Sequence, residues 1–120
     1  MQYAILIYDR EEDWASMPEA QRGAMFAEYG RFTQDLKAAG KLRAGEPLQP
    51  SHSATTVRVR DGKTLTTDGP YAETREQLGG FYVLEADNLD EAVAWAARIP
   101  SALIGSVEVR PLATLSLESS

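Results

Sequence analysis

The segment Tyr3–Tyr8 constrains the fold more than any other part of the chain. It reads YAILIY, with apolar or aromatic side chains on both faces of an extended strand. A strand with one solvated face alternates apolar and polar residues, and this segment does not. It therefore predicts a strand in the middle of a sheet rather than at its edge.

The run from Ser16 to Gly40 predicts the first helix. Ser16 and Glu19 have the spacing of a capping box, and Gly40 suits a left-handed cap at the end. Apolar residues at spacings of three and four predict one buried face, made of Met25, Phe26, Tyr29, Phe32 and Leu36. A break near Gly23 stays open, because glycine inside a helix costs about 1 kcal/mol relative to alanine. The charge run Asp9–Asp13 before this helix is expected to be a solvated loop.

The second half of the chain predicts a hairpin and a second strand–helix–strand unit. Thr55–Arg60 (TTVRVR) alternates, and the turn Asp61-Gly62-Lys63 leads into Thr64–Thr67, which makes a β-hairpin. Asn88 and Glu91 have the spacing of a second capping box. The remaining expected elements are an extended connection over Lys41–Pro50 with room for one short strand, strands over Gly80–Ala86 and Ser106–Leu112, a helix ended by Ile99-Pro100, and a tail over Leu115–Ser120.

This order of elements predicts one α+β domain over residues 1–120. Two strand–helix–strand units with an extra hairpin suggest a ferredoxin-like sheet with both helices on one face. The other face then needs cover, and the strand residues offered to it are partly apolar. We therefore expect a homodimer, in which a second copy covers that face.

Composition excludes several classes of function. The chain has no cysteine, so it has no disulfide scaffold, thiolate zinc site, iron–sulfur cluster or cysteine nucleophile. Its formal net charge of −6 argues against a nucleic-acid partner, which needs a clustered basic surface. No apolar run spans a membrane and no signal peptide is present, so we expect a cytoplasmic protein. The one histidine and the scattered carboxylates match no metal-site spacing, and no cofactor motif is found, so we expect neither.

The most unusual stretch is Thr67–Gly80, which combines a turn with a dense set of charges. In one interpretation it is only a turn: Asp68 caps its own backbone, Gly69 takes positive φ, and Gly79-Gly80 permits a bulge or a close backbone approach. In the other, the turn also presents a site. A carboxylate on a tight loop can move a proton, and Arg75 can bind a carboxylate or phosphate on a small polar or anionic ligand.

The same stretch carries a family resemblance. DGPYAETREQLGG, over Asp68–Gly80, resembles the DGPF(AETKE) motif of the YCII-related family, with Tyr71 for the usual Phe and Arg75 for the usual Lys. The similarity continues through AGKLRAGEPLQP, TTVRVR, GGFYVLEADNLDEAVAWAARIP and VEVRPL, and covers nearly the whole chain. The resemblance implies a dimeric α+β barrel of the ferredoxin-like type, in agreement with the element order.

The resemblance also implies an acid/base site. YCII-like relatives are regarded as enzymes with a His–Asp pair in a cleft, and by motif position Asp68 is the acidic member. Their histidine belongs to the first helix, but here the segment Arg22–Leu36 contains none. The only histidine is His52, in the loop before the hairpin; it either approaches Asp68 or is simply an exposed polar residue.

Other side chains are candidates for binding. Glu73 and Tyr71 belong to the loop that begins with Asp68-Gly69-Pro70, which we call the DGP loop. Tyr29 could present its hydroxyl to a cleft, and Arg110 could attract an anion on the open face of the sheet or pair with Glu108. Two hypotheses follow. The first is a small-molecule enzyme that uses Asp68, assisted by His52, Arg75 or Arg110. The second is a non-catalytic ligand-binding or regulatory module, because some DGPF relatives are encoded beside extracytoplasmic-function sigma factors.

Overall fold

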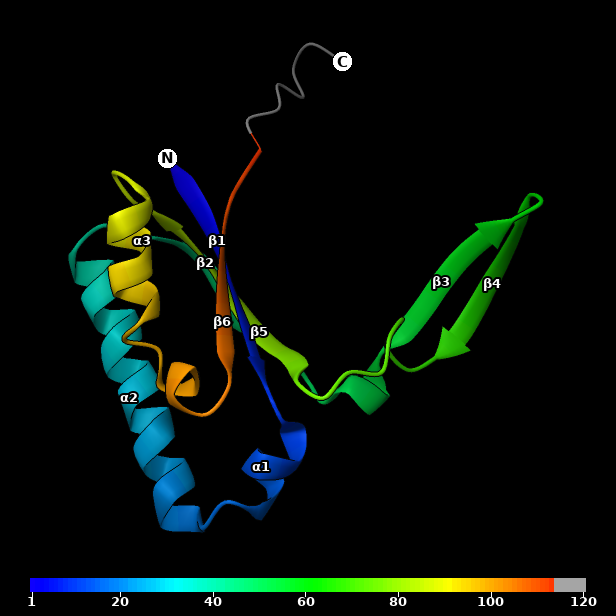
Figure 1. Cartoon of the computed structure of the whole chain (residues 1–120), viewed down its shortest axis with the longest axis horizontal. Helices are drawn as coiled ribbons and strands as arrows, with labels where there is room; N and C mark the ends of the chain where they lie inside the picture. Colours follow the sequence, from blue (N-terminus) through cyan, green and yellow to red (C-terminus); the bar gives the residue numbers. More distant parts are fainter. Residues whose placement is uncertain (114–120) are drawn as a thin grey trace.

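A four-stranded antiparallel sheet forms the body of the molecule in the computed structural model, which describes residues 1–113 (Figure 1). The predicted tail over Leu115–Ser120 lies outside these residues. The strand order is β2-β5-β1-β6, with bounds β1 Gln2–Asp9, β2 Leu42–Pro47, β5 Gln77–Glu85 and β6 Ser106–Pro111. The YAILIY segment is thus an inner strand, as predicted.

Both long helices, α2 (Glu19–Ala38) and α3 (Leu89–Ala96), lie on the same face of this sheet (Figure 1). This arrangement confirms the predicted ferredoxin-like α+β fold. The core lies between the two layers, where Ile5, Leu36 and Leu84 are fully buried. Phe32 packs edge-to-face on Tyr82, with ring centroids 5.2 Å apart. Removing such a fully buried side chain typically costs 2–5 kcal/mol.

The start of the first helical region differs from the prediction. Asp9–Asp13 is not wholly a loop, because a short helix, α1 (Glu11–Ser16), begins within it. Ser16 does not cap α2: its hydroxyl donates to the carbonyl of Asp13, and the chain is extended at Met17. Pro18 explains the change, since a residue before proline avoids the helical region. The helix α2 runs without a break through Gly23, whose surroundings are open.

The buried face of α2 is also narrower than the predicted one. Of the five apolar positions expected to share it, only Phe32 and Leu36 are buried. Phe26 remains 59% exposed and stacks on Trp14 of α1, with ring centroids 5.4 Å apart. The helix extends beyond the end of the sheet, so its first half has no strand beneath it to pack against (Figure 1).

The predicted hairpin is present, but it stands apart from the main sheet. Strands β3 (Thr55–Arg60) and β4 (Lys63–Asp68) form their own two-stranded sheet, which projects from the body (Figure 1). Asp61 and Gly62 both take positive φ, as the hairpin turn requires. We call Thr55–Asp68 the arm. Because of it the radius of gyration is 16.6 Å, against about 14 Å for a compact domain of this length.

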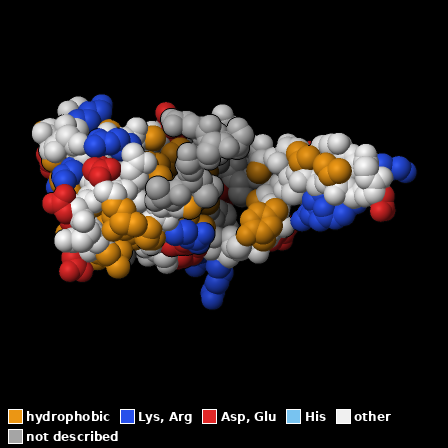
Figure 2. Space-filling model, turned by 90° about the horizontal axis from the view of Figure 1, so that it is seen from above, with side chains coloured by type: hydrophobic (Ala, Val, Ile, Leu, Met, Phe, Trp, Pro, Cys, Tyr) orange, Lys and Arg blue, Asp and Glu red, His pale blue; other side chains and the backbone are white. Residues whose placement is uncertain are grey.

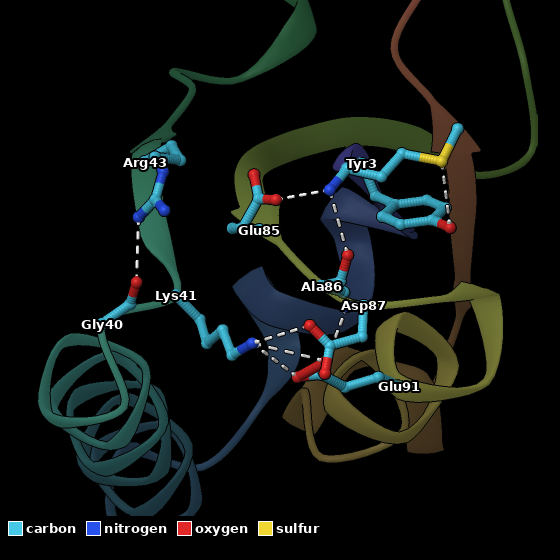
Figure 3. A network of polar contacts seen from close by, with 9 residues as sticks. Tyr3, Gly40, Lys41, Arg43, Glu85, Ala86, Asp87 and Glu91 are labelled. Carbon is cyan, nitrogen blue, oxygen red and sulfur yellow. Dashed lines mark hydrogen bonds and ion pairs between the residues drawn. The ribbon is translucent and has the colours of Figure 1, made fainter.

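One end of the sheet is closed by paired charges (Figure 3). Lys41 lies 3.3 Å from a carboxylate oxygen of Glu91 and 3.7 Å from one of Asp87, and the amino group of Met1 pairs with Glu85. Glu91 also accepts a hydrogen bond from the backbone N–H of Asp87, which together with Lys41 lowers the pKa of the Glu91 carboxyl. Asn88 accepts from the backbone N–H of Glu91, so the predicted cap of α3 is confirmed. We call this the closed end.

None of the helices within residues 1–113 combines the length and the apolar character that a membrane crossing requires.

Candidate functional site

An open groove of about 1080 Å³ lies at the opposite end of the sheet, where the arm joins the body. Tyr8 of β1 and Leu78 of β5 contribute its walls from the sheet. The rest comes from the short 3₁₀ helix η1 (Ser51–Ser53), the residues around it and the DGP loop. The groove therefore brings together three parts of the chain that the sequence separates.

The DGP turn is held by backbone geometry. Gly69 has φ of 104°, a value that other residues rarely adopt, and its N–H donates to the carbonyl of Ala54 at 2.7 Å. The hydroxyl of Thr56 donates to the carbonyl of Gly69 at 2.8 Å. Within residues 1–113 the carboxylate of Asp68 takes part in no hydrogen bond or ion pair, so an aspartate cap does not hold this turn. Asp68 is exposed on the groove.

The double glycine at the end of the motif has the structural role predicted for it. The pairing of β1 with β5 shifts register at Gly79, which makes a bulge. A side chain at Gly80 would bring a Cβ atom within 3.1 Å of the carbonyl oxygen of Glu46 on β2. The bulge explains the glycine at position 79, and the close strand contact explains the glycine at position 80.

Glu11 fixes the two loops of the groove relative to each other. Its carboxylate accepts the backbone N–H of Ser51 at 2.6 Å and the Ser51 hydroxyl at 2.9 Å. Its own N–H donates to the side-chain oxygen of Gln77, whose amide nitrogen donates to the carbonyl of Thr74. This residue thereby holds η1, which carries His52, beside the end of the DGP loop. Sequence reasoning missed it, because no local pattern connects residues forty positions apart.

A buried carboxylate supports the same region from behind. Asp9 is only 5% exposed and accepts hydrogen bonds from the Trp14 indole and the Ser101 hydroxyl, both at 2.7 Å. Ser101 in turn lies 2.5 Å from the Tyr29 hydroxyl. Burial, followed by the nearby Asp9 charge, raises the pKa of Tyr29, although its hydrogen bond to Ser101 opposes this.

The predicted position of Asp9 in a solvated loop is therefore wrong. Alternation along β1 does contain the signal: Tyr3, Ile5 and Ile7 face the helices, and Asp9 continues that series.

The groove gathers some of the predicted site residues and not others. Asp68, His52, Glu73 and Tyr71 all line it, and Tyr71 is 81% exposed. The other three predicted residues lie elsewhere: Arg75 lines a smaller hollow of about 330 Å³ with Arg10, Tyr29 is bonded to Ser101, and Arg110 pairs with Glu108. The two hollows meet, since Thr74 and Gln77 line both.

Comparison with known proteins identifies the family. The model of the YCII-related domain matches residues 1–116. The chain belongs to the YCII-related domain family. This YCII-related protein is 37% identical over 115 residues to an uncharacterized protein of Rhizobium meliloti (strain 1021), covering 94% of the chain and 93% of that protein.

A solved structure supports the same fold. It is 5-chloro-2-hydroxyhydroquinone dehydrochlorinase from Burkholderia phenoliruptrix AC1100, in complex with 2,5-dihydroxybenzoquinone. The YCII-related chain is similar to it with a TM-score of 0.55 and 20% identity, over 94% of each chain. At this identity the likeness concerns the fold alone.

The polar groups on the groove of this YCII-related chain can do acid/base chemistry. An imidazole and a carboxylate on one open surface are the usual groups for moving protons near neutral pH. No hydrogen bond joins His52 to Asp68 in the part of the chain that the structure describes. Within residues 1–113 no group of three or more His, Asp or Glu side chains is arranged to hold a metal ion.

Proposed function

We propose that this protein is a small-molecule enzyme whose groove binds a ring-shaped, oxygen-substituted substrate and whose acid/base groups are Asp68 and His52. The observation that carries the proposal is that these two residues, from separate loops, line the same groove. The proposal assigns no lysine or cysteine nucleophile, because the chain has no cysteine and none of the groove-lining residues within 1–113 is lysine.

The lining of the groove supports this class of substrate. Apolar side chains, among them Leu48, Pro70 and Leu78, share the lining with a similar number of polar ones, so the groove offers a small organic molecule both a packing surface and hydrogen-bonding groups. Tyr71 offers an exposed ring on which a planar substrate can stack. The dehydrochlorinase with the same fold is bound to 2,5-dihydroxybenzoquinone, a molecule of this kind.

In this proposal each polar residue has a separate task. His52 accepts a proton from a ring hydroxyl of the substrate. Asp68 either orients the substrate or exchanges a proton with a group on the opposite side of the ring. Arg75 binds an anionic substituent of the substrate that extends into the adjoining hollow, and Glu73 faces the polar edge of the substrate ring. We further propose that the protein works in the cytoplasm as a homodimer, whose second copy covers the sheet face turned away from the helices.

The test uses 2,5-dihydroxybenzoquinone as the probe. We expect it to shift amide signals of the groove loops in ¹H–¹⁵N NMR spectra, with affinity reduced at least tenfold in Asp68→Asn and in His52→Gln. Glu108→Gln is the matched control, because Glu108 is a carboxylate away from the groove. Turnover is then followed by absorbance with 5-chloro-2-hydroxyhydroquinone. Shifts outside the groove, or equal affinity in all variants, would contradict the proposed site.

A second function is favoured by one observation: Asp68 and His52 are both exposed and are not bonded to each other. A non-catalytic ligand-binding or regulatory module needs no formed dyad. Binding of the probe without turnover of any halogenated or hydroxylated ring compound would support this alternative. Its proposed partner, an extracytoplasmic-function sigma factor, is tested by calorimetric titration with the purified sigma factor in the presence and absence of the probe.

A further inference from the structure

The smaller hollow of about 330 Å³ beside the groove, which we call the side hollow, contains two arginines. Strands β1 and β5 run antiparallel, with Asp9 opposite Gln77. The chain that leaves β1 therefore runs beside the chain that enters β5, and this brings Arg10 and Arg75 to one hollow. Like charges on neighbouring segments repel each other, and an anion bound between them removes that cost. The side hollow is lined by Arg10, Glu11, Glu12, Thr74, Arg75 and Gln77.

The carboxylates of the side hollow already have partners within the chain. Both oxygens of Glu11 accept hydrogen bonds from Ser51, one from its backbone N–H and one from its hydroxyl. The carboxylate of Glu12 pairs with Arg10. Neither carboxylate pairs with Arg75 in the described part of the chain, although both line the same hollow.

The neutral polar side chains of the side hollow have partners as well. The Thr74 hydroxyl donates to the carbonyl of Glu76 at 2.5 Å, and the Gln77 amide nitrogen donates to the carbonyl of Thr74 at 2.6 Å. The guanidinium of Arg75 takes part in no hydrogen bond or ion pair within residues 1–113. Among the described residues that line the side hollow, Arg75 alone keeps all its N–H donors for a ligand.

The charges around the side hollow favour a carboxylate as the group that is bound. A guanidinium binds a carboxylate through two parallel hydrogen bonds, which the ammonium group of lysine cannot do. The two arginines and the two glutamates that line the hollow cancel in formal charge, and Glu76 adds a negative charge next to Arg75 in the chain. A doubly charged phosphate therefore meets more repulsion here than a singly charged carboxylate.

The ion pair between Arg10 and Glu12 can open to admit such a ligand. Its two side chains are 43% and 69% exposed, and ion pairs at this exposure contribute little to stability because water competes for both charges. Arg10 can therefore exchange Glu12 for a ligand carboxylate at little cost, and then binds it together with Arg75.

We infer that the side hollow is a carboxylate subsite of the groove, so that the substrate is a hydroxylated ring with a short acidic substituent. Thr74 and Gln77 line both the groove and the side hollow, and the substituent passes this junction to reach Arg75. Arg75 binds the carboxylate, and Arg10 adds a second guanidinium when it leaves Glu12. The inference rests on the proposed function and adds the acidic group by which the substrate is selected.

The test compares 2,5-dihydroxyphenylacetate with its methyl ester, which has the same ring and no charge. Isothermal titration calorimetry under nitrogen measures both affinities. We expect the wild type to bind the acid at least tenfold more tightly than the ester, and Arg75→Gln to bind the two equally. Arg75→Lys should keep only part of the preference, because it restores the charge without the planar fork of donors. The acid, and not the ester, should shift the Arg75 Nε–H signal in ¹H–¹⁵N NMR spectra.

Arg58→Gln is the matched control for the loss of a positive charge. Arg58 is also exposed and has no ion pair within residues 1–113, but it belongs to β3 of the arm. Figure 2 shows Lys and Arg side chains on the surface of this projecting part of the molecule. The control should prefer the acid as strongly as the wild type does. A loss of preference as large as in Arg75→Gln would overturn the subsite, because net charge alone would then set the affinity.

Glu12→Gln tests the role of Arg10 by a gain of affinity rather than a loss. Without its competitor, Arg10 is free for the ligand, so we expect the affinity for the acid to rise severalfold and the affinity for the ester to stay unchanged. The double variant Arg10→Gln with Glu12→Gln should lose this gain. A gain that persists in the double variant would overturn the role of Arg10, since removal of one negative charge would explain it.

The outcomes separate this inference from the proposed function. Equal affinity of the wild type for the acid and the ester overturns the carboxylate subsite and leaves the ring site in the groove in place. A preference for the acid that survives in Arg75→Gln overturns the assignment of the side hollow. If neither compound binds and 2,5-dihydroxybenzoquinone does not bind either, the proposed function itself fails, and the inference fails with it.

Discussion

The two ends of the sheet treat their charged side chains in opposite ways. At the closed end Lys41 lies between Asp87 and Glu91, and the amino group of Met1 pairs with Glu85 (Figure 3). At the groove end Asp68 and Glu73 lie exposed without ion pairs in the described part of the chain. Charges that serve folding tend to be paired or to cap a helix, so those kept unpaired on a concave surface are better explained by ligand binding.

The groove end nevertheless has a paired layer of its own, one step behind the surface. Glu11 bonds to Ser51, and Asp9 bonds to Trp14 and Ser101. These carboxylates fix the loops, whereas the exposed ones remain available. Two classes of carboxylate therefore lie at the same end of the sheet: supporting carboxylates, which hydrogen-bond to the loops, and exposed carboxylates, which face the groove. We expect mutations of the two classes to have different effects.

The largest effect is expected for Asp9→Ala. The substitution leaves the Trp14 indole N–H and the Ser101 hydroxyl without their acceptor in a buried place, so we expect a loss of about 3 kcal/mol in the free energy of unfolding. Urea denaturation measures it. Asp9→Asn is the matched control: it keeps an acceptor oxygen and should lose clearly less. Equal stability of Asp9→Ala and the wild type would mean that Asp9 is not a supporting residue.

Much of the fold could be predicted from the sequence, since it follows from local patterns. The inner position of β1, the hairpin turn at Asp61-Gly62, the Asn88 cap and the bulge at the double glycine all rest on residues close together in the chain. The predicted start of the first helix was wrong because two local signals compete there. The spacing of Ser16 and Glu19 favours a capping box, whereas a residue before Pro18 prefers an extended backbone.

The site was less predictable because its contacts are not local. Asp68 and Tyr71 came from a motif, but Glu11 acts on Ser51, and Asp9 on Ser101, across the fold. In the sequence, the members of each pair look like ordinary polar residues of the surface. Only the alternation of β1 points inward at Asp9, and the adjacent charge run conceals that signal.

A smaller effect, with a defined pH dependence, is expected at the closed end for Glu91→Gln. The pKa of Glu91 is lowered in the folded protein by the Asp87 N–H and by Lys41, so its charged form stabilises the fold above its ordinary pKa. The variant should be less stable than the wild type near neutral pH. The difference should shrink as the pH falls below about 4.5 and the wild-type carboxyl is protonated. Urea denaturation at a series of pH values measures it, and Asp90→Asn is the control; a difference independent of pH would contradict the role of the Glu91 charge.

The smallest effect on the free energy of unfolding is expected for Asp68→Asn. This variant is the strictest test of the distinction between supporting and exposed carboxylates. Asp68 is an exposed carboxylate that holds nothing within residues 1–113, so its loss should change the free energy of unfolding by less than about 0.5 kcal/mol. Thr56→Val is the matched variant in the same turn. It removes the hydroxyl that bonds the Gly69 carbonyl and should cost about 1 kcal/mol. If the order were reversed, with Asp68→Asn the more damaging change, Asp68 would belong with Asp9 among the supporting carboxylates. The proposed acid/base site would then lose its central residue. If the order holds, the turn is built to present Asp68 without depending on it, which is the property that a reactive carboxylate at a groove requires.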